Sequence, residues 1–295
     1  MLKLIAPAGE YERIEAEPVE AQLVEAEAVV SWNSRAAAGS LELRVLRRDG
    51  ERSGWLPYVT WSAQGRRSLS GADGVAAIEL DIVRAPSPIA ALEVRATAPL
   101  DALAVSLPPR HEPGGGGARV PALDVAPRSQ YLEDHPLQRG WCSPASLAML
   151  LAYWGHALPT EEVAARVRDD AYGGTGNWAF NAALAGALGL RAAVVHLRGL
   201  AHAASFLAAG VPLALSFAWR AGELPGAALE STDGHLAVLV GLDARGDPLL
   251  NDPAQPSLRA RYGRDAFERA WLGHGGIAYA LAPPERADLA ALANA

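Results

Sequence analysis

The sequence changes its pattern at a run rich in proline and glycine, residues 108–117. Before this run, short segments alternate apolar and polar residues, as residues 40–47 and 77–83 do. Alternation with a period of two is typical of strands that bury one face. After the run, apolar helical patterns come first and several short apolar strands follow, which is typical of an α+β domain. The break therefore predicts two domains of different class.

We expect three segments from this pattern. Residues 1–108 are predicted to form an all-β sandwich of six to eight short strands, with a strand at residues 77–83. Residues 109–119 are predicted to be a flexible linker, and residues 120–295 an α+β domain. A chain of 295 residues has room for two domains, because a domain takes about 150 residues. In the third segment, helices are predicted at residues 143–154, 178–188 and 200–209 and from residue 160, and strands at residues 191–197, 211–219, 235–242 and 248–251.

The composition excludes several classes of protein. The formal net charge is −7 and the isoelectric point is near 5.5, whereas a nucleic-acid-binding surface would be basic. One cysteine is too few for a disulfide framework or a zinc site of several cysteines. No uninterrupted run of apolar residues is long enough to span a membrane. The first residues lack a signal peptide, so we expect a cytoplasmic protein, or a secreted one if a signal has been removed. Nothing in the sequence indicates the oligomeric state.

The single cysteine, Cys142, lies where a polar loop becomes an apolar helix. Ser143 and Pro144 are expected to be the cap and the first helical position, and Gly155 ends the pattern. A thiol at the N-terminus of a helix feels the positive end of the helix dipole, which favours the thiolate. The alternative is a buried cysteine that acts only as a small apolar side chain.

His235 is the best candidate for a base among the seven histidines. It begins an apolar strand, and a strand would hold the imidazole rigidly. Asp252 follows at the end of the next predicted strand, and a turn at residues 243–247 would bring the two strands together in antiparallel fashion. The carboxylate could then fix the tautomer of the imidazole. The alternative for Asp252 is a turn residue before Pro253.

Other side chains could complete the cleft. The amide of Gln130, at the end of an extended segment, or of Gln138, in a loop, could join the backbone N–H of Cys142 in an oxyanion hole. We favour Gln130 because its direction is better defined. Trp141, Trp178 and Trp219 could shape the cleft, although aromatic side chains more often fill a core.

These residues lie in ordered motifs that resemble a known family. The motifs are SQ at residues 129–130, WCSPAS at 141–146, DGHLAVLVG at 233–241, NDP at 251–253 and YGRDAFERAWL at 262–272. Together they are similar to the stand-alone C39-like cysteine peptidases, relatives of the leader peptidase domains of bacteriocin exporters. The resemblance covers roughly residues 120–282. Ser143 replaces the glycine that more often follows the nucleophile, and Gln130 lies farther from the cysteine than the glutamine of many members does.

The resemblance implies a papain-like fold and a Cys142–His235–Asp252 triad with an oxyanion-hole glutamine. It implies a peptidase that hydrolyses a peptide or protein through a thioester, with neither a metal nor a cofactor. Two alternatives remain open. One is another thiol acyl transfer on the same scaffold, by an amidase or a transglutaminase-like enzyme. The other is a non-catalytic protein that binds a surface ligand or a glycan.

Overall fold

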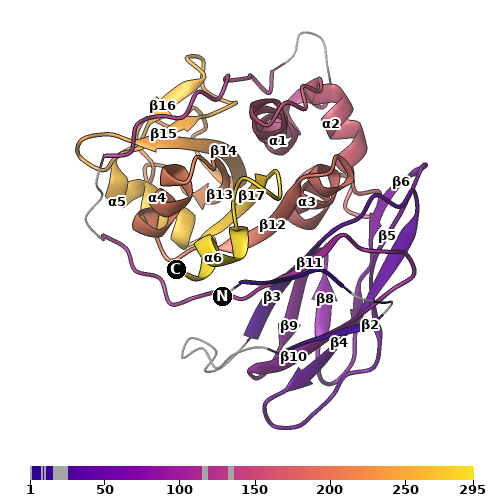
Figure 1. Cartoon of the computed structure of the whole chain (residues 1–295). Coiled ribbons are helices and arrows are strands. Elements are labelled where there is room, and N and C mark those ends of the chain that lie inside the picture. Colours follow the sequence, from indigo (N-terminus) through magenta and orange to yellow (C-terminus); the bar gives the residue numbers. More distant parts are fainter. Residues whose placement is uncertain (1, 8, 10, 16–25, 115–118, 132–135) are drawn as a thin grey trace. The chain divides into compact units, whose positions relative to one another are not determined.

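The computed structural model describes residues 2–7, 9, 11–15, 26–114, 119–131 and 136–295 (Figure 1). The chain divides into two compact units. The first unit contains Met1–Arg110 and Arg166–Val194, and the second contains His111–Ala165 and Val195–Ala295. The chain therefore passes between the units three times.

The first unit contains two antiparallel sheets. The six-stranded sheet has the order β1-β11-β3-β9-β8-β7, and the five-stranded sheet has the order β2-β10-β4-β5-β6. The strands are β1 (Leu2–Ile5), β2 (Tyr11–Glu15), β3 (Ala26–Asn33), β4 (Gly39–Arg47), β5 (Leu56–Ser62), β6 (Gly65–Ser68), β7 (Gly71–Ala72), β8 (Ala77–Glu79), β9 (Ile82–Ala85), β10 (Ile89–Ala96) and β11 (Ala102–Ser106). The described residues thus form more strands than the six to eight predicted, because several are too short to show alternation.

Helix α3 (Trp178–Ala187) belongs to this first unit. Phe180 lies in the same apolar cluster as the strand residues, and its ring meets Trp32 of β3 edge to face with centroids 5.8 Å apart. The helix comes very close to β3, since a Cβ at Gly186 would lie 2.4 Å from the Cβ of Asn33. Many strands precede the helices, but a separate all-β sandwich is not confirmed, because the unit that holds the strands also holds α3.

The prediction of a single strand at residues 77–83 is wrong. β8 and β9 form a tight hairpin instead, with Glu79 opposite Ile82. Leu80 adopts a φ of 57°, which is uncommon for a residue with a side chain. The turn places Asp81 so that its Oδ2 accepts a hydrogen bond from the backbone N–H of Trp178 at 2.6 Å. Asp81 therefore caps the first turn of α3.

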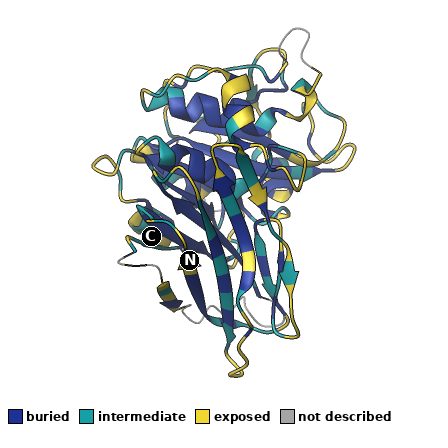
Figure 2. Cartoon of the chain, turned by 90° about the vertical axis from the view of Figure 1, so that its right-hand side faces the viewer, coloured by how far each residue is buried: buried dark blue, intermediate teal, exposed yellow. Residues whose placement is uncertain are grey.

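The second unit is built on a six-stranded sheet with the order β12-β17-β13-β14-β15-β16. Helix α1 packs on β14 and β13, and α5 packs on β13. β13, β14 and β17 are buried along most of their length. Figure 2 shows the buried residues of the chain in dark blue. The elements are η1 (Gln138–Gly140), α1 (Cys142–Tyr153), α2 (Thr160–Val167), β12 (Arg191–His196), α4 (Leu200–Ala208), β13 (Leu213–Trp219), β14 (Thr232–Leu242), β15 (Pro248–Asn251), β16 (Arg259–Arg261), α5 (Arg264–Leu272), β17 (Ile277–Ala282) and α6 (Leu289–Asn294).

The helices and strands predicted after residue 142 are confirmed, with shifted ends. The boundary between the units passes through α2 and β12. In the part of the chain that the structure describes, no helix is long and apolar enough to cross a membrane.

Part of the predicted linker is hydrogen-bonded within the second unit. Glu112 donates its backbone N–H to the carbonyl of Arg198 at 2.7 Å. Gly114 donates its N–H to the buried carboxylate of Glu268 on α5 at 2.8 Å. Residues 115–118 of this segment lie outside the described residues. Glu112 and Gly114 are thus held within the second unit, Gly114 on α5.

Candidate active site

Cys142 is the first residue of α1, and Trp141 is the N-cap. The expectation that Ser143 caps the helix is wrong, because its hydroxyl lies inside the first turn, 3.1 Å from the hydroxyl of Tyr279. Burial raises the pKa of the Cys142 thiol. A hydrogen bond and the charge of His235, with the backbone N–H groups of Leu236 and Ser143, outweigh burial, so the pKa falls below its ordinary value. The environment therefore favours a thiolate.

His235 lies within β14, opposite Phe217 of β13. The strand begins at Thr232, so pairing on both sides of the histidine holds the ring in place. Its Nε2 lies 2.8 Å from Oδ1 of Asp252, which leaves the other ring nitrogen for the hydrogen bond with Cys142. Burial lowers the pKa of His235, but the carboxylate of Asp252 and the thiolate outweigh it and raise the pKa to about 10. An imidazolium paired with the thiolate is the favoured state.

Asp252 directly follows β15 and is almost fully buried. Its Oδ1 accepts the backbone N–H of Ala254 at 2.9 Å in addition to the imidazole, and its backbone N–H donates to Leu258. Burial raises the pKa of this carboxyl, but the charge and hydrogen bond of His235 outweigh burial and lower it. The structure thus brings Cys142, His235 and Asp252 together, with the aspartate in its charged form.

A tyrosine that the sequence analysis did not assign to the site holds the second oxygen of Asp252. The hydroxyl of Tyr262, just after β16, donates to Oδ2 at 2.6 Å, and the ring is almost fully buried. Gln255 in turn donates its Nε2 to this hydroxyl at 3.1 Å. The tyrosine was within the motif at residues 262–272, but nothing in the spacing indicated its contact with the carboxylate.

Gln130 is buried beside the loop that precedes the nucleophile. Its Nε2 donates to the carbonyl of Arg139 at 3.0 Å, and its backbone N–H donates to the carbonyl of Pro253 at 3.0 Å. Its Oε1 is buried without a hydrogen-bond partner among the described residues. Gln138, in η1, is half-buried, and its backbone carbonyl lies 3.4 Å from the Nε2 of Gln130. Gln130 therefore connects the loop before Cys142 to the turn after Asp252.

Two aromatic rings of β13 shield the imidazole from water. Phe217 and Trp219 both meet His235 edge to face, with centroids 5.3 and 5.8 Å away. A water-poor environment strengthens the attraction between the imidazolium and its two anionic neighbours. Trp141 is buried, and Trp178 belongs to α3 of the first unit. Of the three tryptophans considered from the sequence, Trp219 is the one that contacts the proposed base.

The arrangement can support nucleophilic catalysis by a thiol, because a nucleophile, a base and an orienting group are in contact. In the described ranges, no group of three or more histidine, cysteine, aspartate and glutamate side chains could hold a metal ion.

Comparison with known proteins identifies the family. The model of the Peptidase_C39 like family matches residues 122–279, more than half of the chain. No curated protein matches. A C39-like peptidase from Bacillus anthracis is 19% identical, with a TM-score of 0.42 over 56% of this chain and 98% of that chain. A double glycine motif protease from an AMS/PCAT transporter, solved with the leader peptide, is 19% identical, with a TM-score of 0.36 over 55% and 96%. On the strength of the family match, the chain belongs to the Peptidase_C39 like family and is a cysteine peptidase.

Proposed function

We propose that this peptidase hydrolyses a peptide or protein substrate through Cys142, His235 and Asp252. The observation that carries the proposal is the position of His235, whose Nε2 lies 2.8 Å from Oδ1 of Asp252 and whose ring also hydrogen-bonds to Cys142. A histidine in this position can take the proton of the thiol and later give it to a leaving amine.

The reaction runs through two acyl transfers. The thiolate of Cys142 attacks the carbonyl carbon of the scissile bond, the C–N bond breaks, and the imidazolium of His235 gives its proton to the leaving amine. The product is a thioester on Cys142. Neutral His235 then takes a proton from water, the hydroxide attacks the thioester, and the C–S bond breaks. The acid product leaves, and the thiolate–imidazolium pair is restored.

Gln130 is proposed as a donor to the oxyanion, together with the backbone N–H of Cys142. The proposal is supported by the position of Gln130, which is buried between the loop before Cys142 and the turn after Asp252. Gln130→Ala should lower kcat about 10²–10³-fold, as the loss of an oxyanion donor does. Gln138→Ala, the matched control, should leave kcat within about twofold. Steady-state kinetics of both variants would separate the two glutamines, and the reverse result would assign the role to Gln138.

We further propose that the strand-rich front part is a β-sandwich-like module. Support comes from two antiparallel sheets of six and five strands whose buried side chains share one apolar cluster. The division at residues 108 and 120 stays a prediction.

The activity is tested with a peptide library and the intact chain. Wild type should release peptides with new termini, Cys142→Ala should release none, and mass spectrometry should find the acyl group attached to Cys142 of the wild type. An added amine competes with water for the thioester. Transfer to the amine without hydrolysis would replace the proposal by a transferase or ligase. Absence of cleavage, with Cys142 alkylated by iodoacetamide no faster than a free thiol, would indicate a non-catalytic binding protein.

A further inference from the structure

Two buried hydroxyl groups meet beside the first turn of the nucleophile helix. Ser143 is the second residue of α1, and its Oγ lies 3.1 Å from the hydroxyl of Tyr279 on β17. Each of the two residues is 1% exposed. A buried hydroxyl costs free energy unless it is hydrogen-bonded, so each group stabilises the position of the other. The proposed reaction moves no proton through either group, so their role must lie in what they hold in place.

The first turn of α1 supplies part of the environment of the thiolate. The backbone N–H of Ser143 hydrogen-bonds to the sulfur of Cys142, and so does the backbone N–H of Leu236 on β14. One turn further along the helix, the buried Ser146 donates its hydroxyl to the carbonyl of Leu236 at 3.1 Å. Both N–H groups reach the sulfur only while the first turn keeps its place against the sheet.

The start of α1 is fixed from a neighbouring strand instead of by its own cap. The N-cap is Trp141, whose side chain has no oxygen that could accept an N–H of the first turn. Tyr279, which meets the first turn, lies opposite Ala214 of β13. Ala214 in turn lies opposite Val238 of β14, three residues after His235. The hydroxyl pair thus ties the start of α1 to the sheet that holds the base.

We propose that Ser143 and Tyr279 are positioning residues for Cys142. Their paired hydroxyls hold the first turn of α1 at the distance from β14 at which two backbone N–H groups face the sulfur. Loss of either hydroxyl loosens this turn and weakens those hydrogen bonds, so the thiolate becomes less stable relative to the thiol. The proposal rests on the proposed function of Cys142 as the nucleophile and assigns two further residues to the same site.

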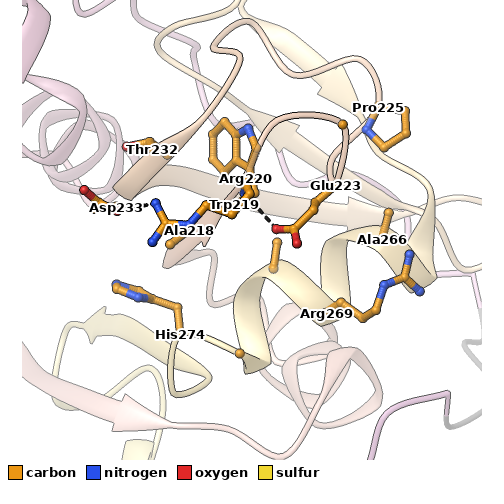
Figure 3. Close-up of a pocket in the computed structure, with 13 residues that line it drawn as sticks. Ala218, Trp219, Arg220, Glu223, Pro225, Thr232, Asp233, Ala266, Arg269 and His274 are labelled. Atoms are coloured by element: carbon orange, nitrogen blue, oxygen red, sulfur yellow. Dashed lines mark hydrogen bonds and ion pairs between the residues drawn. The ribbon is translucent and has the colours of Figure 1, made fainter.

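The pair cannot act by touching the substrate, because both side chains are buried. It is also separate from the pocket of about 580 Å³ that Figure 3 shows beside Trp219 of β13 and Ala266 of α5. Neither Ser143 nor Tyr279 lines that pocket. The expected effects are therefore on the reactivity of the thiol and not on the binding of a substrate.

The first test measures the reactivity of the thiol at different pH values and requires no substrate. Cys142 is the single cysteine, so the rate of alkylation by iodoacetamide reports on it alone. This rate rises with pH on the acid side, as the thiolate forms. In Tyr279→Phe and in Ser143→Ala, the midpoint of the rise should move to higher pH by about 0.5–1 unit, the effect of weakening one hydrogen bond to the thiolate. The double variant should shift no further than the single variants, because the two hydroxyls form one contact.

Tyr153→Phe is the matched control. Tyr153 is the last residue of the same helix, and its hydroxyl donates to the carbonyl of Gly210 at 3.0 Å. Its loss weakens the packing of α1 at the end away from the sulfur, so the midpoint should stay that of wild type. An unchanged midpoint in both Tyr279→Phe and Ser143→Ala would overturn the proposal. An equal shift in Tyr153→Phe would overturn it too, because the effect would then be one of helix packing in general.

The second test uses a peptide that the library identifies as a substrate. Tyr279→Phe should lower kcat about three- to tenfold and leave KM within about twofold, because the thiolate is less available and the binding surface is unchanged. A higher KM with an unchanged kcat would contradict the positioning role. If wild type cleaves no peptide, the proposed function fails, whereas the alkylation profiles still decide whether the two hydroxyls position the thiol.

Discussion

Asp81 of the first unit and Asp252 of the second are both buried aspartates that accept hydrogen bonds, yet their acidities differ. Asp81 accepts the N–H of Trp178 and has another aspartate, Asp169, as its charged neighbour, and burial raises its pKa to about 6. Asp252 pairs with His235 and accepts the hydroxyl of Tyr262, and its pKa is lowered. Burial disfavours the charge of both carboxylates, and a cationic partner reverses the result at only one.

The comparison separates two uses of a buried carboxylate. Asp252 keeps its charge and can hold an imidazolium in a fixed orientation. Asp81 caps a helix and changes its charge near neutral pH. Substitutions that remove these contacts one at a time should break this difference.

Asp252→Asn should have the largest effect on activity. Without the carboxylate the imidazole loses its orientation and the charge that raises its pKa, so kcat should fall about 10²–10⁴-fold. In wild type, kcat/KM should fall above pH 10 or so, where His235 loses its proton. In the variant that basic limb should move to lower pH, because the pKa of His235 is then raised by Cys142 alone and no longer by the Asp252 carboxylate. A pH profile of kcat/KM for both proteins measures this.

Asp81→Asn is the matched control for that experiment, because it neutralises the other buried aspartate. It should leave kcat within about twofold, since Asp81 belongs to the first unit. An activity loss like that of Asp252→Asn would show that the carboxylates are not functionally distinct.

The same Asp81→Asn variant should be more stable than wild type at neutral and basic pH. A carboxyl whose pKa is raised on folding contributes stability below its unfolded pKa, and this contribution is lost as pH rises through about 6. At pH 8 the variant should therefore be more stable than wild type by about 2–3 kcal/mol, and at pH 3.5 the gain should vanish. Denaturant unfolding at the two pH values measures it. A gain of equal size at both values would mean that the charge of Asp81 is not its cause.

Tyr262→Phe should lower activity much less than Asp252→Asn does. It removes the hydroxyl that donates to Oδ2 of Asp252 and keeps the buried ring. The loss of one hydrogen bond, about 1.4 kcal/mol of activation free energy, should lower kcat about tenfold. KM should stay unchanged, because the hydroxyl positions Asp252 and does not face the substrate. Gln255→Ala, which removes a donor to the tyrosine, should have a weaker effect in the same direction. A rise in KM with unchanged kcat would contradict this positioning role.

Much of the second unit could be predicted because its patterns are local. Cys142 stands where a polar loop becomes an apolar helix. His235 stands on one strand and Asp252 directly after the next, and a short turn joins the two strands. These signals need only the helical and strand periods and the turn residues. Tyr262 could not be assigned, because its contact depends on the path of the chain after Pro253, where Leu258 adopts a φ of 58°.

The first unit is harder to predict from the sequence, because its decisive features depend on tertiary contacts. Residues 77–83 alternate through a turn, so the alternation hid the hairpin at Leu80. Residues 178–187 are apolar on nearly all sides, which indicates a buried helix but does not reveal what buries it. Tertiary contacts such as the packing of Phe180 against Trp32 assign α3 to the unit of the strands.

The place of α3 in the chain has a consequence for synthesis on the ribosome. The strands of the first unit, up to Ser106, are translated before Phe180 and Ala183, which complete their apolar cluster. Residues 111–165, including the nucleophile helix, are made in between. The nascent chain must therefore wait with an open hydrophobic surface on its first part while the second part emerges, and the two halves mature together instead of one after the other.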